Sequence, residues 1–403
     1  MKRFFGLMVF LGCVFMQLHA QKEIQWRGEN RTGSYNETGL LKKWPANGPK
    51  LLWSYDNLGE GYSQMAIADG KIFITGMKGS GHQGYMSVFS LSGKLLQQKV
   101  YATEWVGNYS GPRAAVTYDQ GRLYYLSGLG ELVCLNAKTL NAVWKKDILK
   151  TFGAEILKYG MNEAPLIVGN MVIATPGGKK NNVVALDKNS GKLIWSSAAL
   201  GEEAAYCSPI YIGDQQVPQI VTITENHIIS LQASNGKLLW SYPFPSKWNE
   251  QCNSPIYSQG MVLCTTGNGT GSVKLQLTNG GRKVTKLWES AELDNVYSAV
   301  VKEGNYVYGF GKGQTWVCLD WKTGKLMHKT RSQQCVPIAA DGMLYLYCTN
   351  GDVLLVKPQS DKMNVVSKFK ITKGTEQHWA DPVIYNGVLY IRHGSSLMAY
   401  QIK

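Results

Sequence analysis

The amino-acid sequence predicts an all-β protein, an eight-bladed β-propeller built from four-stranded antiparallel blades. Three observations predict this fold: a phrase of two short strands that recurs along the chain, a pair of apolar strands between successive copies, and half a phrase near the start that completes the last copy near the end. A recurring phrase of this kind indicates an array of identical supersecondary units. The repeat, rather than the length of 403 residues, therefore decides the number of domains.

The phrase is clearest at residues 185–195, where the sequence is ALDKNSGKLIW. An apolar run leads into an Asn-Ser-Gly turn and then into Lys-Leu-Ile-Trp, the pattern of two strands joined by a tight turn. Related phrases occupy residues 134–144, 230–240 and 318–328, with Leu140 in the glycine position of the first and His328 in the tryptophan position of the last. Successive tryptophans lie 45 to 51 residues apart, which is the spacing of propeller blades.

A second pair of strands precedes each phrase. The two strands of this pair are joined by a dipeptide that contains Gly, often with Asn or Asp. Such dipeptides between apolar runs predict hairpins, because tight turns need residues that tolerate positive φ. The eight turns are expected at Asp69-Gly70, Gln120-Gly121, Gly169-Asn170, Gly213-Asp214, Gln259-Gly260, Glu303-Gly304, Asp341-Gly342 and Asn386-Gly387. Each unit therefore contains four strands.

The two ends of the repeat array predict how the ring closes. The eighth unit stops at residues 397–402, which form its third strand. The missing fourth strand is residues 50–55, so the first strand of the array should complete the last blade and leave no open sheet edge. We expect a signal peptide at 1–20, a leader at 21–49 and a single propeller domain at 50–403.

The first twenty residues are typical of a signal peptide. Lys2 and Arg3 precede an apolar run, and Ala20 supplies the small residue that signal peptidase requires. The residues around Cys13 form a poor lipobox, which disfavours a lipoprotein. No other stretch is long and apolar enough to span a bilayer. The sequence predicts an exported protein of the periplasm or the extracellular space, without a transmembrane segment.

The net charge of +14 is spread over many turns. Scattered lysines indicate a solvated basic surface, and for an exported chain they disfavour a nucleic-acid partner. We expect a monomer.

The cysteines do not form a zinc or haem-attachment spacing. Cys134 and Cys318 take the same apolar strand position in two repeats and are predicted to be buried free thiols. Cys207 and Cys252 begin equivalent strands of neighbouring repeats, and they are the pair for which a disulfide is plausible.

The repeats resemble the tryptophan-docking motif of the PQQ-like (quinoprotein alcohol dehydrogenase-like) propeller family, whose members have eight blades. The leader residues Gln25-Trp26-Arg27-Gly28 and Asn30-Arg31-Thr32-Gly33 resemble those of an exported subfamily labelled polyvinyl-alcohol-dehydrogenase-like. Further likeness lies at Gly111–Arg113, Asn162–Pro165 and Trp379–Pro382.

The resemblance implies two functions. Quinoprotein dehydrogenases hold PQQ between a tryptophan and, in many members, a ring of two adjacent cysteines, with a Ca²⁺ ion and an Asp base. This chain has neither adjacent cysteines nor a haem-attachment sequence, which favours a non-catalytic scaffold without a cofactor, similar to the propeller lipoprotein of outer-membrane assembly. The alternative is a PQQ-dependent alcohol or sugar dehydrogenase that uses PQQ and Ca²⁺.

In the scaffold interpretation, an envelope protein or a small organic ligand binds at the funnel mouth. The loops at that mouth are rich in aromatic rings, which suit a quinone, a sugar or a peptide. The predicted ligand-binding residues are Arg113, Asn162, Glu163, Tyr206, Asn253, Tyr297, Trp379 and Asp381. Tyr62, Gln64, Trp105, Tyr109, Tyr159, Trp248 and His378 are expected at the same mouth.

Chemistry at the mouth would depend on its carboxylates. Asp381 and Glu163 are the candidate catalytic residues. Asn162, Glu163 and Asp381 offer hard oxygens for Ca²⁺, although this ion usually takes 6–8 oxygen ligands and only three are visible. A packing role for the aromatic residues, blade against blade, is the alternative to a binding role.

Overall fold

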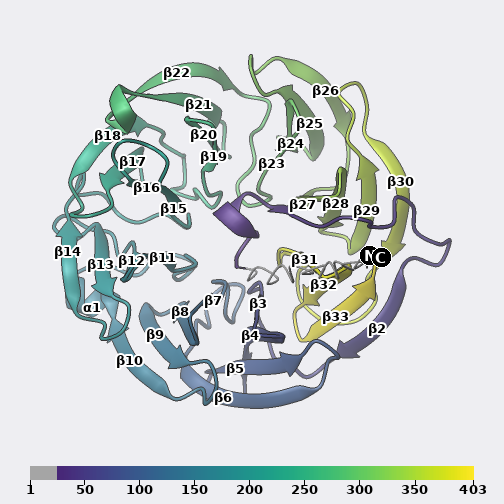
Figure 1. The fold of residues 1–403 in the computed structure, drawn as a ribbon, viewed down its shortest axis with the longest axis horizontal. Helices are drawn as coiled ribbons and strands as arrows, with labels where there is room; N and C mark the ends of the chain where they lie inside the picture. Colours follow the sequence, from purple (N-terminus) through teal and green to yellow (C-terminus); the bar gives the residue numbers. More distant parts are fainter. Residues whose placement is uncertain (1–24) are drawn as a thin grey trace, which may run out of the picture.

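In the computed structural model, which describes residues 25–403, eight sheets are arranged around a central axis (Figure 1). The predicted signal peptide and Cys13 lie outside the described residues. Each blade has four antiparallel strands, which confirms the predicted eight-bladed propeller. No helix among residues 25–403 is long and apolar enough to cross a membrane.

Blades 1 to 4 follow one another in the chain. They comprise β3 (Ala66–Ala68), β4 (Lys71–Lys78), β5 (Gln83–Ser90) and β6 (Leu95–Thr103); β7 (Thr117–Asp119), β8 (Arg122–Leu126), β9 (Glu131–Asn136) and β10 (Ala142–Asp147); β11 (Leu166–Val168), β12 (Met171–Ala174), β13 (Val183–Asp187) and β14 (Leu193–Ser197); and β15 (Ile210–Ile212), β16 (Gln219–Ile223), β17 (His227–Gln232) and β18 (Leu238–Pro243). A short helix, α1 (Ile148–Phe152), connects blades 2 and 3.

Blades 5 to 8 complete the ring. They comprise β19 (Ile256–Ser258), β20 (Met261–Thr266), β21 (Gly271–Thr278) and β22 (Lys283–Ser290); β23 (Val301–Glu303), β24 (Tyr306–Gly311), β25 (Thr315–Asp320) and β26 (Leu326–Arg331); β27 (Cys335–Ala340), β28 (Met343–Cys348), β29 (Asp352–Lys357) and β30 (Asn364–Lys370); and β31 (Val383–Tyr385), β32 (Val388–His393), β33 (Ser396–Gln401) and β2 (Lys50–Tyr55). A 3₁₀ turn, η2 (Asn279–Gly281), joins β21 to β22.

The first strand of the array closes the ring as predicted. β2 pairs antiparallel with β33, with Lys50 opposite Gln401 and Tyr55 opposite Leu397. Figure 1 shows β2 at the rim beside the end of the chain. Blade 8 is therefore built from both ends of the propeller, and its sheet has no gap between them.

The hairpins between the first two strands of each blade form near their predicted positions. At Asp69-Gly70 and Asp341-Gly342 both turn residues have positive φ, the conformation of a type I′ turn that matches the twist of the flanking strands. The sixth turn lies at Gly304-Asn305, one residue later than predicted.

The repeated tryptophans dock each blade onto the next. In four copies the indole ring lies against the turn glycine of the following blade, where an added Cβ would approach the ring within 2.4 to 2.8 Å. The pairs are Trp53 with Gly93, Trp144 with Gly191, Trp195 with Gly236, and Trp288 with Gly324. The indole N–H of Trp195 donates to the Ala233 carbonyl of that neighbouring turn at 3.1 Å. The turn glycine is therefore required both for positive φ and for contact with the indole.

The leader adds an element that the repeat did not predict. After the 3₁₀ turn η1 (Glu29–Arg31), strand β1 (Ser34–Tyr35) pairs in parallel with β27, so the sheet of blade 7 has five strands. Figure 1 shows η1 near the centre of the ring, from which the leader runs out to β2 at the rim.

The cysteines correct one prediction and confirm another. Cys207 and Cys252 are not bonded to each other, and the disulfide joins Cys335 and Cys348 instead. These two are directly opposite one another in the β27–β28 pair, where cross-strand side chains lie close together. Cys134 and Cys318 are buried free thiols, as expected.

The docking contact predicts a difference between two glycine substitutions. Gly236→Ala and Gly342→Ala both place alanine at positive φ, which costs about 1–2 kcal/mol. Only Gly236→Ala also pushes a Cβ into a ring, that of Trp195, and overpacking adds about 1–3 kcal/mol. Thermal and urea unfolding should show a clearly larger loss for Gly236→Ala. Equal losses would contradict the docking role of the glycine.

Candidate functional site

The leader fills the axis of the propeller with two buried arginines. The guanidinium of Arg31 donates to the carbonyl oxygens of Ala164 at 2.9 Å, Pro165 at 2.8 Å and Pro209 at 3.1 Å. These carbonyls immediately precede or lie beside the first strands of blades 3 and 4. A planar fork of N–H donors suits several carbonyls at once, which a lysine could not match.

Arg27 makes the equivalent contacts on the other side of the axis. Its guanidinium donates to the Val300 carbonyl of blade 6 at 2.9 Å and forms a 2.8 Å ion pair with Asp381 of blade 8. Its backbone N–H donates to Oε1 of Gln64 at 3.0 Å, next to blade 1. The two arginines thus fasten the leader to the inner edges of blades on opposite sides of the ring.

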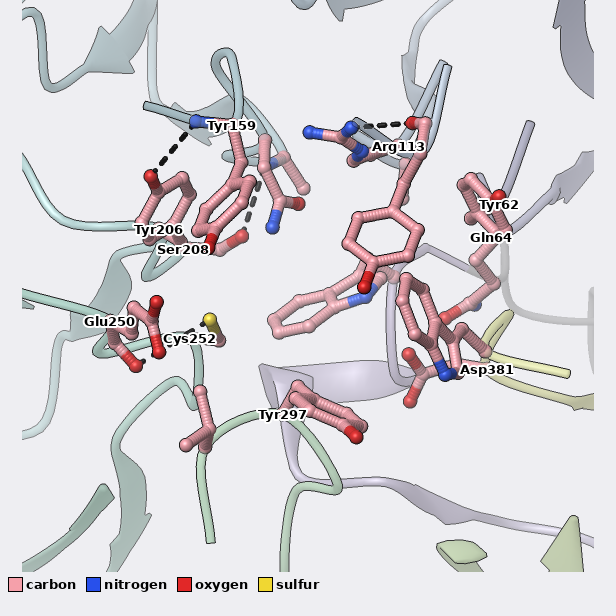
Figure 2. Close-up of a pocket in the computed structure, with 17 residues that line it drawn as sticks. Tyr62, Gln64, Arg113, Tyr159, Tyr206, Ser208, Glu250, Cys252, Tyr297 and Asp381 are labelled. Atoms are coloured by element: carbon pink, nitrogen blue, oxygen red, sulfur yellow. Dashed lines mark hydrogen bonds between the residues drawn. The ribbon is translucent and has the colours of Figure 1, made fainter. Parts of the chain in front are cut away.

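One cavity, of about 370 Å³, opens beside this leader. Its walls come from blade-to-blade connections and from residues just before the first strands of the blades, and Trp26 of the leader also lines it. Figure 2 shows Tyr159 and Tyr206 on one side of the cavity, and Tyr62 and Asp381 on the other. The lining residues are Trp26, Tyr62, Gln64, Tyr109, Arg113, Ala115, Tyr159, Asn162, Ala164, Tyr206, Ser208, Glu250, Cys252, Val296, Tyr297, Trp379 and Asp381.

Aromatic rings from six of the blade-to-blade connections form an arc around the cavity. The ring centroids are 4.6 Å apart for Tyr109 and Trp379, 5.5 Å for Tyr297 and Trp379, and 6.1 Å for Tyr159 and Tyr206. Tyr109 and Tyr297 remain 45% and 47% exposed. Much of the surface of these two rings is therefore open to water and is not used in packing blade against blade.

The cavity carries three charged groups. Arg113 donates to the backbone carbonyls of Asn108 and Tyr109 through one nitrogen, which leaves the rest of its guanidinium for the cavity. Burial lowers the pKa of Arg113. The carboxylate of Glu250 makes no hydrogen bond to another described residue, whereas that of Asp381 is paired with Arg27.

Six of the eight predicted ligand-binding residues line this cavity: Arg113, Asn162, Tyr206, Tyr297, Trp379 and Asp381. Asn253 lies outside its lining. The amide of Asn253 is buried, donates to the Asn295 carbonyl at 3.0 Å and accepts from the Ala299 N–H at 2.9 Å, so it supports the connection between blades 5 and 6.

Glu163 also lies outside the cavity lining. Its side chain is buried and accepts the backbone N–H of Thr175 at 3.0 Å. Burial raises the pKa of Glu163 to about 7, with the nearby Arg31 charge acting in the opposite direction. The side chain therefore supports the segment after β12 in blade 3, near Arg31, and is not part of the wall of the cavity.

Of the other residues expected at the mouth, Tyr62, Gln64, Tyr109 and Tyr159 line the cavity, and three do not. Trp105 lies against Arg113, 6.0 Å from ring centroid to Cζ. Trp248 is 59% exposed. His378 stacks on His393 with ring centroids 3.6 Å apart, and burial lowers its pKa to about 4.

The described residues do not assemble the Ca²⁺ ligands that the quinoprotein resemblance implies. Asn162 and Asp381 line the cavity, but Glu163 does not, and residues 25–403 contain no group of three His, Cys, Asp or Glu side chains that could hold a metal ion. The disulfide lies in blade 7 and does not line the cavity either. The residues present therefore do not fit a Ca²⁺–quinone centre with a disulfide ring against the quinone.

The sequence did not predict seven of the lining residues or the two axial arginines; the lining residues are Trp26, Ala115, Ala164, Ser208, Glu250, Cys252 and Val296. Trp26, Arg27 and Arg31 belong to the leader motif, and the pattern of that motif does not show its place on the axis. Glu250 and Cys252 belong to the connection between blades 4 and 5. In that connection the sequence predicted Trp248 at the mouth, because an exposed aromatic residue in a loop is a stronger signal of binding than a single carboxylate.

Comparison with known proteins supports the fold. A family profile described as Outer membrane protein assembly factor BamB matches residues 82–219 and 214–402. The crystal structure of BamB from Moraxella catarrhalis superposes with a TM-score of 0.65 at 16% identity, over 88% of this chain and 99% of that one. None of the curated proteins compared with the chain matches it significantly.

Two other solved structures are similar in fold. The quinohemoprotein alcohol dehydrogenase of Comamonas testosteroni gives a TM-score of 0.65 at 11% identity, over 94% of this chain and 80% of that one. Sqt1 of Saccharomyces cerevisiae gives a TM-score of 0.58 at 12% identity, over 87% of this chain and 98% of that one. At such identities the likeness concerns the fold alone.

The buried carboxyl of Glu163 predicts a pH-dependent stability. Its pKa is about 7 in the folded protein and about 4.3 in an unfolded chain. The folded state therefore binds more protons between these values, so its stability falls as pH rises from about 4.3 to about 7 and levels off above that. Glu163→Gln, which keeps the acceptor for Thr175, should stabilise the protein at pH 8 by about 4 kcal/mol and change little at pH 4.

Urea unfolding at the two pH values measures this effect, with the exposed Glu155→Gln as the control. A destabilised Glu163→Gln protein at pH 8 would mean that Arg31 holds Glu163 ionised, contrary to this account.

Proposed function

The chain belongs to the PQQ-like propeller family described as outer membrane protein assembly factor BamB, and we propose that it is an exported, non-catalytic scaffold of the cell envelope. In this proposal the mouth cavity binds a segment of an envelope protein or a small organic ligand. The finer placement, in the polyvinyl-alcohol-dehydrogenase-like subfamily, depends on the leader motif and is part of the same proposal.

One observation carries the binding role: an open, aromatic-lined cavity beside a channel that the leader fills. Arg27 and Arg31 are 3% and 5% exposed, and their contacts hold the leader against the inner edges of the blades. A ligand at this mouth would therefore meet a cavity whose wall includes the leader residue Trp26. Cavities that combine apolar surface with a few polar groups are the usual binding sites of proteins.

The sequence supports export. Lys2 and Arg3, the apolar run after them and Ala20 have the pattern of a cleaved signal. A member of the same family whose crystal structure is similar is itself named BamB, an outer membrane protein assembly factor. We extend the envelope location to this chain by that analogy, and a monomeric state is part of the same proposal.

The second candidate function is a PQQ-dependent alcohol or sugar dehydrogenase. The observation that favours it is the guanidinium of Arg113 beside aromatic faces in a cavity large enough for an organic cofactor. Titration of the mature protein with PQQ and Ca²⁺, followed by quinone absorbance and dye reduction, separates the two functions. Saturable binding with turnover would establish the dehydrogenase and overturn the scaffold.

A photo-crosslinking residue can test the scaffold directly. Placed at Tyr297, which lines the cavity and is exposed, it should give a discrete adduct in intact cells. The same residue placed at Trp248, which is exposed outside the cavity, should not give that adduct. Adding Trp379→Ala should reduce the yield from position 297, because Trp379 packs beside Tyr297. Equal adducts from positions 297 and 248 would contradict binding at the cavity.

A further inference from the structure

We propose that the ligand of the mouth cavity is a short, neutral oligosaccharide, recognised by stacking on the aromatic arc and by hydrogen bonds from the edges of the same rings. This inference rests on the proposed binding function and names the class of ligand. It follows from the exposed ring faces, the unpaired polar groups, the balance of charge and the occupation of the inner strand edges.

The first support is the set of ring faces. Tyr109, Trp379 and Tyr297 form a contiguous series, and the rings of Tyr62 and Trp379 are 5.3 Å apart. Aromatic faces carry partial negative charge, so they attract the C–H groups that the face of a sugar ring presents. Several rings in one arc offer successive platforms to the successive units of an oligosaccharide.

The second support is the set of polar groups without partners. Neither the amide of Asn162 nor the carboxylate of Glu250 makes a hydrogen bond to another residue within 25–403. The same holds for the indole N–H groups of Trp26 and Trp379 and for the hydroxyl of Tyr297. This set mixes donors with acceptors. A sugar hydroxyl is both donor and acceptor, so a polyhydroxylated ligand can satisfy all of these groups.

The third support is the charge. Asp381 is already neutralised by Arg27 at 2.8 Å. What remains in the lining is one cation, Arg113, and one carboxylate, Glu250. A polyanionic ligand would bring its charges near Glu250, and a polycationic ligand would bring its own near Arg113. A neutral ligand avoids both costs and still accepts hydrogen bonds from the guanidinium.

The fourth support concerns a peptide, the main competing ligand. One common mode of peptide recognition adds the peptide as a strand to a free sheet edge, through backbone hydrogen bonds. Here the leader already uses inner-edge carbonyls of several blades, including Pro165 and Pro209 for Arg31 and Val300 for Arg27. β1 also covers the inner edge of β27. A peptide that added to the edge of β27 would have to displace the leader, whereas a sugar needs no strand edge.

Calorimetric titration of the mature protein with cellotriose, maltotriose and chitotriose tests the proposal, with trigalacturonic acid as the anionic comparison. At least one neutral trisaccharide should bind saturably, and the anionic one should bind more weakly. Trp379→Ala and Tyr297→Ala should each weaken binding about tenfold, since each removes a stacking platform. Trp248→Ala, which removes an exposed indole outside the cavity, should change it less than twofold. Unchanged melting temperatures would show that the variants are folded.

Two results would overturn the proposal: no binding of any neutral trisaccharide, or binding that is unchanged in Trp379→Ala and Tyr297→Ala. The crosslinking experiment distinguishes the consequences. If no sugar binds but position 297 gives an adduct with a protein, the ligand class is wrong and the scaffold function stands. If neither sugars nor an adduct are found at the cavity, the ligand class and the binding function both fail.

Discussion

The pairing of β2 with β33 closes the ring and fixes the point at which the leader must reach the propeller. It places residue 50 at the rim of the ring, while the leader before it begins on the axis, beside the first strands of the blades. The chain must therefore cross from the centre of the propeller to its edge before the array begins. It does so along blade 7, where β1 adds a strand to the sheet. Trp44 also packs there against Phe369, with 5.1 Å between the ring centroids.

Two arginines make the axial part of the leader a component of the fold. Burying a guanidinium is costly unless its donors are satisfied. Arg31 meets that requirement with backbone carbonyls, and Arg27 with carbonyls and the carboxylate of Asp381. The ion pair has a second effect, since it removes one negative charge from the cavity wall. The same contacts that fasten the leader therefore determine the charge that a ligand would meet at the mouth.

The fold could be predicted because its determinants are local and repeated. Trp195 and Gly236 lie in successive copies of one phrase. Residues 50–55 match the second half of that phrase, which is the strand missing from the last blade, so their pairing with β33 could be predicted. The leader could not be placed in this way, because it occurs once and has no periodic pattern. The cysteines show the same limit: Cys335 and Cys348 are paired by strand register, which the spacing of cysteines in the sequence does not reveal.

The candidate site was predicted at the level of loops and less well at the level of side chains. Asn162 and Glu163 are neighbours in an irregular segment, and only Asn162 faces the cavity. Successive side chains of an extended chain point in opposite directions, so a motif that contains both residues cannot show which one lines the wall. Trp26 was available in the leader motif, but its role depends on the axial course that the two arginines impose.

Hydrogen–deuterium exchange of the mature protein tests the central claim, that the leader is held on the axis beside the cavity. The amides of Arg27, Arg31 and Gly33 donate hydrogen bonds in the structure, so peptides covering residues 25–35 should exchange as slowly as the propeller strands. In Arg31→Met these peptides should exchange faster, while those of blades 1 and 5 stay protected. Exchange of residues 25–35 at the rate of an unstructured chain in the wild-type protein would contradict the account.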